Sequence, residues 1–158
     1  MNALVIYDSV FGNTEKVARA IAEGLAKNAS VDLMRPGEVA IESLAGFDLL
    51  VVGSPTRGFQ ATEATVALLK RLPAEGLQGR RAAAFDTRID ARDIKQAAFR
   101  FMVNTGGYAA KKIADRLKKA GAEMAAAPEG FIVEATEGPM RSGELERAAA
   151  WGARLAGA

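Results

Sequence analysis

The sequence feature that most constrains the fold is a nearly uninterrupted apolar run, FDLLVVG, at residues 47–53. A strand with one face in water shows alternating polar residues, whereas a run that is apolar almost throughout is typical of a central strand covered on both faces. The run is far shorter than the ~20 apolar residues that a membrane helix needs. We therefore expect a buried strand within a sheet that carries helices on both sides.

The rest of the chain alternates short apolar or β-rich runs with segments of helical period. In the first helical segment, for example, Val17, Ile21 and Leu25 fall on one face. The expected strands are residues 2–7, 31–34, 47–53, 81–86 and 131–135, and the expected helices are residues 14–27, 63–72, 91–103, 108–119 and a last helix from Ser142. This alternation predicts an α/β fold with a parallel sheet and right-handed crossovers. A length of 158 residues suits one domain, residues 1–158.

The composition excludes several kinds of chemistry. The chain has no His and no Cys, so it offers no thiolate nucleophile, no Ser-His-Asp triad and no ordinary zinc or iron–sulfur site. Redox activity would have to come from a bound cofactor, and we expect no metal. Lys plus Arg number 21 and Asp plus Glu 19, a net charge of +2, which weakly favours acidic partners and gives no support for nucleic acid. No leader or membrane segment is recognisable, so we expect a cytoplasmic protein without membrane insertion.

The candidate binding residues lie in loops that follow the expected strands, because open parallel sheets bind ligands beyond the carboxyl ends of their strands. These loops are polar and contain Gly, Pro or Thr at several positions. They cover residues 8–14, 54–62, 86–92 and 136–142.

The first of these loops has the chemistry of a phosphate site. Ser9, Asn13 and Thr14 offer hydroxyl or amide groups, and Gly12 lets the backbone approach a ligand closely. The loop opens onto a helix N-terminus, whose amides and dipole favour an anion. Alternatively, Asn13 or Thr14 simply caps the helix. The loop has neither GxGxxG nor GxxxxGK(S/T), so neither a dinucleotide fold nor a nucleoside triphosphatase is indicated.

Two loops resemble those of flavodoxins. Residues 9–14, SVFGNT, are similar to the phosphate loop usually written (S/T)-x-T-G-N-T, and residues 53–58, GSPTRG, resemble the flavodoxin loop after the third strand. The order of elements is similar over essentially the whole chain. The resemblance implies a single-domain, three-layer α/β/α flavodoxin-like fold, whose five-stranded parallel sheet has the order 2-1-3-4-5, and one FMN held without a covalent bond.

The resemblance also implies which residues bind FMN. The first loop would bind the phosphate, largely through backbone amides, the second would lie against the inner face of the isoalloxazine ring, and the third would lie at the ring edge. In that order the residues are Ser9, Val10, Phe11, Gly12, Asn13 and Thr14; Pro55, Thr56, Arg57, Gly58 and Phe59; and Asp86, Thr87 and Arg88. No residue is assigned a catalytic role.

Several positions depart from the flavodoxin pattern. Val10 and Phe11 stand where Thr is usual, Arg57 where Trp is frequent and Phe59 where an acid is frequent. No Tyr near Ile89 matches the ring that usually stacks on the outer face of the flavin. The phosphate therefore loses two hydroxyl partners, and the ring loses an aromatic neighbour.

An extra stretch after residue 86, compared with short-chain flavodoxins, contains three apolar residues that either cover the flavin or form the core of an inserted helix. They are Phe99, Phe101 and Met102. Trp151 on the last helix is interpreted as a packing residue. The five basic residues from Lys111 to Lys119 are interpreted as a mostly solvated helix face.

These observations favour an FMN-binding redox protein, and we expect an electron carrier that serves a redox partner protein with an acidic surface. The absence of an obvious catalytic acid or base favours the carrier over a small FMN-dependent oxidoreductase of the quinone or NAD(P)H type. A flavodoxin-like binding or regulatory module that has lost its flavin is a further alternative, and we expect a monomer or weak dimer. Arg57 near the ring would make the second reduction potential less negative, unless it points to solvent or pairs with Glu63.

Overall fold

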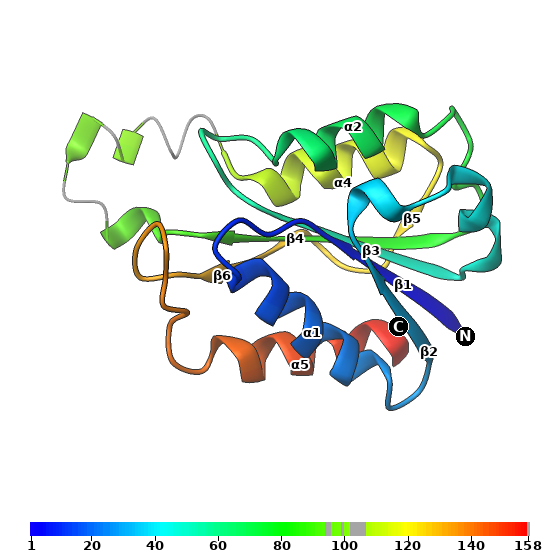
Figure 1. Cartoon of the computed structure of the whole chain (residues 1–158), viewed down its shortest axis with the longest axis horizontal. Coiled ribbons are helices and arrows are strands. Elements are labelled where there is room, and N and C mark those ends of the chain that lie inside the picture. Colours follow the sequence, from blue (N-terminus) through cyan, green and yellow to red (C-terminus); the bar gives the residue numbers. More distant parts are fainter. Residues whose placement is uncertain (94–95, 99, 102–106, 158) are drawn as a thin grey trace.

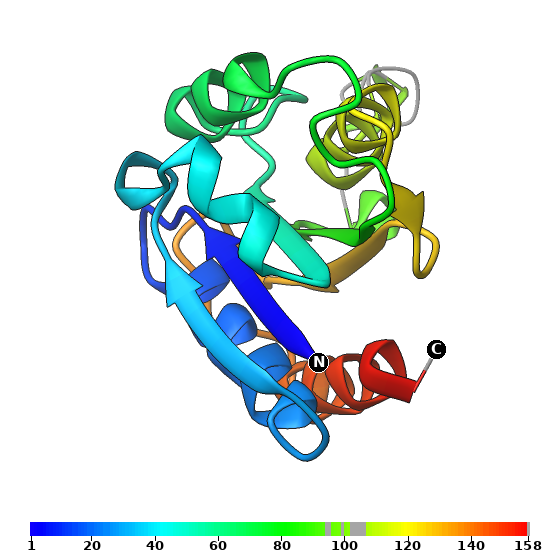
Figure 2. The same ribbon diagram turned by 90° about the vertical axis from the view of Figure 1, so that its right-hand side faces the viewer.

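The computed structural model describes residues 1–93, 96–98, 100–101 and 107–157, and its elements form three layers (Figure 1). A central sheet lies between one pair of helices, α1 and α5, and a second pair, α2 and α4 (Figures 1 and 2). The strands are β1 (Asn2–Tyr7), β2 (Ser30–Met34), β3 (Leu49–Pro55), β4 (Arg81–Arg88), β5 (Glu123–Met124) and β6 (Glu129–Ile132). The helices are α1 (Asn13–Leu25), α2 (Glu63–Arg71), α4 (Ala109–Lys119) and α5 (Glu144–Gly157), with short 3₁₀ helices η1 (Pro36–Glu38), η2 (Ile41–Gly46) and η3 (Ala91–Asp93).

The sheet has the order β2-β1-β3-β4-β5 and its named strands pair in parallel, which confirms the predicted fold class and strand order. The fifth position differs from the single strand expected at residues 131–135. It is filled by β5 and then β6, both paired with β4. Residue 133 follows the end of β6 and forms an isolated bridge with Met140. Pro128 lies between the two strands and has no N–H to donate, so it favours an interruption of the ladder there.

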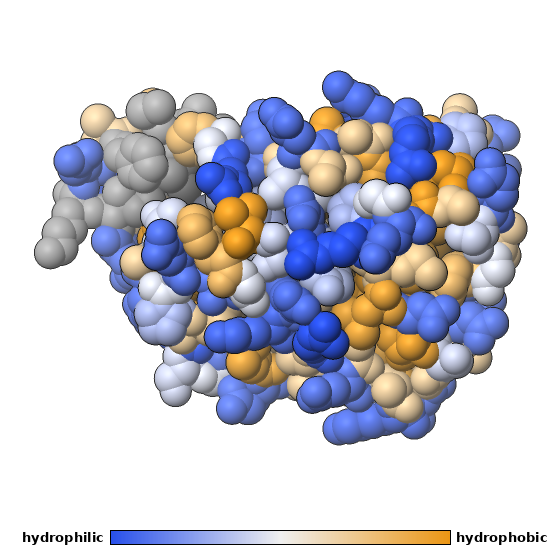
Figure 3. Space-filling model, viewed as in Figure 1, coloured by the Kyte–Doolittle hydropathy of each residue, from blue (hydrophilic) through white to orange (hydrophobic). Residues whose placement is uncertain are grey.

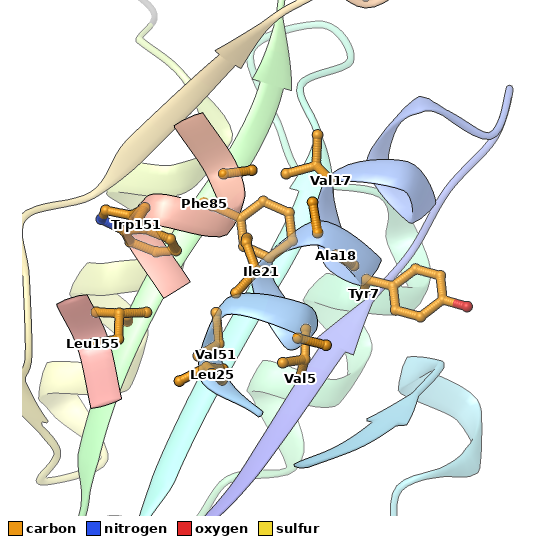
Figure 4. Close-up of a cluster of buried hydrophobic side chains, with 14 of the residues drawn as sticks. Val5, Tyr7, Val17, Ala18, Ile21, Leu25, Val51, Phe85, Trp151 and Leu155 are labelled. Atoms are coloured by element: carbon orange, nitrogen blue, oxygen red, sulfur yellow. The ribbon is translucent and has the colours of Figure 1, made fainter. Parts of the chain in front are cut away.

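The apolar core on the α1 and α5 side of the sheet contains the only Trp of the chain. Trp151 is 4% exposed and packs edge-on against Phe85, with ring centroids 6.4 Å apart (Figure 4). It packs in the same way against Phe131, with ring centroids 6.0 Å apart. Its predicted role as a packing residue is confirmed. Helices α1 and α5 can approach closely because Gly24 has no side chain. A Cβ at this position would lie 1.9 Å from the Ala149 carbonyl oxygen.

The core on the other side of the sheet joins the strands to α2 and α4. Alternate residues of the central strands, such as Leu50 and Val52, face Leu68 of α2 and Ile113 of α4 in one buried cluster. Both faces of β3 are therefore covered, as its apolar run predicts. Hydrophilic side chains cover most of the outer surface seen in Figure 3, with smaller apolar areas between them.

The segment between β4 and α4 only partly matches the helix expected at residues 91–103. Residues Ala91–Asp93 form the 3₁₀ helix η3, and residues 97–98 and 100–101 are helical. Phe101 is 70% exposed, while Phe99 and Met102 lie outside the described residues. Within the described part of the chain, no helix has the length and apolar character needed to cross a bilayer.

Candidate functional site

The loops that follow β1, β3 and β4 meet around a cavity of about 100 Å³ at the carboxyl end of the sheet. Most of the predicted cofactor-binding residues line it. They are Ser9, Val10, Phe11, Asn13, Thr14, Pro55, Thr56, Arg57, Thr87 and Arg88. Three further lining residues, Ile89, Val133 and Thr136, are not among the predicted binding residues. Ile89 and Thr136 belong to the candidate loops 86–92 and 136–142, whereas no sequence signal points to Val133.

The first loop leaves several backbone amides without a protein partner beside this cavity. Gly12 has a φ of 93° and directly precedes α1, and a Cβ at this position would meet no atom within 4 Å. The Ser9 hydroxyl accepts hydrogen bonds from the amides of Gly12 and Glu15, at 3.1 and 3.3 Å. In the described chain, the amides of residues 10, 11, 13 and 14 have no protein acceptor. These amides and the open space at Gly12 fit a phosphate group.

Asn13 and Thr14 tie the first loop to its neighbours. The Thr14 and Thr87 hydroxyls lie 2.7 Å apart, and both residues are buried. The Asn13 amide nitrogen donates to the Glu137 carbonyl oxygen at 3.1 Å. The residue that caps α1 is Gly12, with no side-chain hydrogen bond to the cap, so the alternative that Asn13 or Thr14 serves as the N-cap is wrong.

The second loop folds into a tight turn. Arg57 and Gln60 exchange two backbone hydrogen bonds of 2.8 and 3.0 Å, and the two residues between them, Gly58 and Phe59, have φ values of 53° and 66°. Two positive φ values are typical of a type I′ turn, which Gly adopts freely and Phe adopts at a cost in strain. The Phe59 carbonyl accepts a hydrogen bond from the Lys112 ammonium group. Lys112 is therefore not simply solvated, as its place in a basic helix face had suggested.

Arg57 is exposed at the mouth of the cavity. Its guanidinium carbon lies 5.8 Å from the centroid of the Phe11 ring. Among the described residues no carboxylate comes within ion-pair distance of Arg57, so the alternative pairing with Glu63 is not observed. The charge of Arg57 remains uncompensated beside the cavity.

Asp86 belongs to β4 and lies beneath α4, where it does not line the cavity. It is 0% exposed and accepts hydrogen bonds from the Arg88 guanidinium at 2.6 and 2.8 Å and from the Ala110 amide at 2.9 Å. Burial raises the pKa of the Asp86 carboxyl, and the Arg88 hydrogen bonds oppose that change. Gly12, Gly58 and Phe59 are likewise absent from the cavity lining, although they shape its loops.

Arg88 is held firmly from three sides. Besides its bidentate contact with Asp86, its guanidinium carbon lies 3.8 Å from the centroid of the Tyr108 ring. A Cβ at Gly130 would come within 2.2 Å of the same guanidinium, so a larger residue there would displace it from this position. Tyr108 was not predicted as part of this region because it precedes α4 and is distant in sequence, yet its hydroxyl lies 3.5 Å from the Ile89 carbonyl oxygen.

An ion cluster joins the third loop to the loop after β6. Arg141 pairs with Glu134 at 3.0 Å, with Asp90 at 3.6 Å and with Asp93. Hydrogen bonds from Arg92 lower the pKa of Asp90 to about 2. These contacts fix the outer wall of the site without placing an acid in the cavity lining.

The first loop of this parallel sheet offers free amides at a helix N-terminus, and two further loops lie across the cavity. This arrangement is typical of proteins that bind a phosphate-bearing cofactor at the carboxyl ends of their strands. Comparison with known protein families identifies the family to which the chain belongs. The flavodoxin family model matches residues 5–151, and the chain belongs to the flavodoxin family. Membership of this family implies a flavin cofactor and redox chemistry, so the resemblance seen in the sequence is confirmed.

Known relatives match parts of the chain. A diflavin flavoprotein of Synechocystis sp. is 37% identical over 67 residues, which cover 39% of this chain and 11% of that protein. A protein named NAD(P)H dehydrogenase (quinone), from Cupriavidus metallidurans, is 39% identical over 75 residues, covering 34% of this chain and 38% of that protein. The chain thus matches well under two thirds of the length of these relatives. The structure of oxidised Flavodoxin 2 from Bacillus cereus has a TM-score of 0.78 at 21% identity, with 99% of both chains covered, a likeness of fold.

Proposed function

We propose that the protein binds FMN and works as an electron carrier. The observation that carries this proposal is the lining of the cavity, whose ionisable side chains in the described chain are Arg57 and Arg88. Arginine stays protonated in proteins, so neither side chain can serve as a general acid or base near neutral pH. A site that binds a redox cofactor without a proton-transferring side chain suits electron transfer better than a reaction on a substrate.

The residues present support FMN through two kinds of contact. The unpaired amides of Val10, Phe11, Asn13 and Thr14 would hold the phosphate, so the loss of two threonine hydroxyls still leaves four donors. The flavin ring would lie between the second loop and the Thr87 to Ile89 segment, and the bound flavin supplies the one-electron chemistry.

The experiment is purification followed by absorption spectroscopy. We expect a yellow protein that releases FMN on denaturation, and reconstitution of any apoprotein by added FMN. A colourless protein that also fails to bind added FMN contradicts the proposal and favours the binding or regulatory module without flavin.

A second candidate is a small FMN-dependent oxidoreductase, favoured by the relatives named NAD(P)H dehydrogenase (quinone). Rapid oxidation of NADH or NADPH by the FMN-loaded protein in the presence of a quinone would support this candidate. We expect only slow oxidation, because a carrier has no pocket that orients a nicotinamide. The redox partner that we propose is a protein with an acidic surface.

A further inference from the structure

A groove between α2 and α4 lies outside the cofactor site. Its volume is about 290 Å³. Its apolar lining residues come from both helices and from the segment before α2, and its charged residues come from α4. The apolar residues are Ala61, Val66, Leu69 and Ile113, and the charged residues are Lys112, Asp115, Arg116 and Lys119.

The positive charge of this groove is not balanced within the described chain. Asp115, the one acid in the lining, is already paired with Lys111 at 3.0 Å. Arg116 and Lys119 have no carboxylate within ion-pair distance among the described residues. Lys112 donates to the Phe59 carbonyl, which is uncharged. An acidic ligand would therefore find cations that it need not take from an existing ion pair.

The second loop connects the groove to the cofactor site. Gln60 and Ala61 line the groove, and Arg57, on the other side of the turn formed by Gly58 and Phe59, lines the cofactor cavity. The Lys112 ammonium group lines the groove and also holds the turn between these two places. A chain segment bound in the groove would thus lie next to the loop that flanks the proposed flavin ring, where an electron-transfer partner has to dock.

We propose that the groove binds an acidic, partly apolar segment of the redox partner protein. Its carboxylates would pair with Arg116 and Lys119, and an apolar side chain would pack on the half-buried Val66. An apolar floor beside unpaired cations suits such a segment better than a small inorganic anion, which gains nothing from the floor. This inference rests on the proposed carrier function.

The test uses the FMN-loaded protein and a short fluorescein-labelled peptide in which Glu and Leu alternate. Fluorescence anisotropy measures its affinity at an ionic strength of ~0.15 M, where the Debye length is ~8 Å. The matched variants are Arg116→Glu, inside the groove, and Lys118→Glu, an exposed residue of the same helix outside the groove lining. We expect about a tenfold loss of affinity for Arg116→Glu, because reversal removes an attraction and adds a repulsion, and under about a twofold loss for Lys118→Glu.

Three results would overturn the inference. They are equal losses in the two variants, equal affinity for a peptide with Lys in place of Glu, or displacement of the Glu–Leu peptide by inorganic phosphate or by double-stranded DNA at matched charge. Chemical-shift changes at Val66, Leu69 and Ile113 on addition of the peptide would support it. The FMN content of wild type and both variants is measured separately, so a failure to bind FMN is distinguished from a failure of the groove.

Discussion

The contact between Asp86 and Arg88 gives the sharpest test of how the site is built. Asp86→Ala removes a fully buried carboxylate that accepts three hydrogen bonds of 2.6, 2.8 and 2.9 Å. The Arg88 guanidinium loses its counter-charge, and the Ala110 amide at the start of α4 loses its acceptor. Removing one partner of a buried ion pair costs about 3–5 kcal/mol.

The expected magnitude lies near the lower end of that range for the ion pair. The Arg88 side chain is 21% exposed and also contacts the Tyr108 ring, so its charge is partly solvated after Asp86 is removed. We assign about 3 kcal/mol to the unpaired guanidinium and about 1 kcal/mol to the unpaired amide. The free energy of unfolding should therefore fall by about 3–4 kcal/mol, a large part of the ~5–15 kcal/mol typical of a domain.

The assay is urea unfolding of the apoprotein, followed by fluorescence of the buried Trp151. Asp115→Ala is the matched control, because Asp115 is also paired and its side chain is 50% exposed. An exposed i,i+4 pair on a helix contributes about 0.3–0.5 kcal/mol. If Asp86→Ala costs less than about 1 kcal/mol with an unchanged dependence on urea, the argument that Asp86 anchors Arg88 is refuted.

The pH dependence follows from the direction of the Asp86 shift. Burial raises the pKa of Asp86 in the folded protein above its value of ~3.9 in the unfolded chain. The folded protein therefore keeps the proton to higher pH. The stability that this proton contributes is present below pH ~3.9 and is lost as the pH rises through the folded-state pKa. As the pH rises from ~3.9 through the folded-state pKa of Asp86, the free energy of unfolding of wild type should fall relative to that of Asp86→Asn. A relative rise would mean that the attraction of Arg88 for the carboxylate outweighs the effect of burial.

Three further predictions concern the loops. Thr14→Val leaves the buried Thr87 hydroxyl without its 2.7 Å partner and should lower the free energy of unfolding by about 1–3 kcal/mol in urea. It should also weaken FMN binding in a fluorescence titration. Unchanged values in both measurements would show that Thr14 neither holds Thr87 nor helps to bind FMN. Arg57→Gln should make the second reduction potential of the FMN-loaded protein more negative in a redox titration, and an unchanged potential would show that Arg57 does not act on the ring. Lys112→Met should release the Phe59 carbonyl and raise amide hydrogen exchange in the second loop, whereas unaltered exchange would contradict the tether.

The position of the site could be predicted from the sequence because parallel strands end on one edge. When the apolar runs are assigned as strands, the loops after them must converge, and most of the predicted binding residues of the first two loops do line the cavity. The free amides at the start of α1 followed from the same reasoning. Backbone geometry was thus the reliable part of the prediction, because it depends on periodicity rather than on individual side chains.

The third loop shows why the remainder could not be predicted. The resemblance assigns residues 86–88 to one loop, but β4 continues through Arg88, so the side chains of Asp86 and Thr87 point to opposite faces of the sheet. The Thr87 hydroxyl meets Thr14 on one side of the sheet, while the Asp86 carboxylate meets the Ala110 amide on the other. Where a strand ends decides which face a side chain takes, and strand ends are weakly encoded in the sequence.

Contacts between distant segments were also out of reach of local patterns. Lys112 has the same local pattern as its exposed basic neighbours, and only the packing of α4 beside the second loop brings its ammonium group to the Phe59 carbonyl. Tyr108 reaches the third loop in the same way, through the start of α4. One helix thus supplies two contacts that hold loops of the cofactor site, although no residue of α4 lines the cavity.

The two arginines that line the cavity also differ in a way that their sequence context does not reveal. Arg88 is paired with Asp86, so the two together bring little net charge to the proposed flavin when the carboxyl is ionised. Arg57 has no carboxylate partner in the described chain and lies at the mouth of the cavity. A charge that is already compensated contributes little field at a distance, whereas an uncompensated one acts over its full Coulomb range. The influence of the protein on the flavin potential should therefore come from Arg57 rather than from Arg88, which is paired with Asp86.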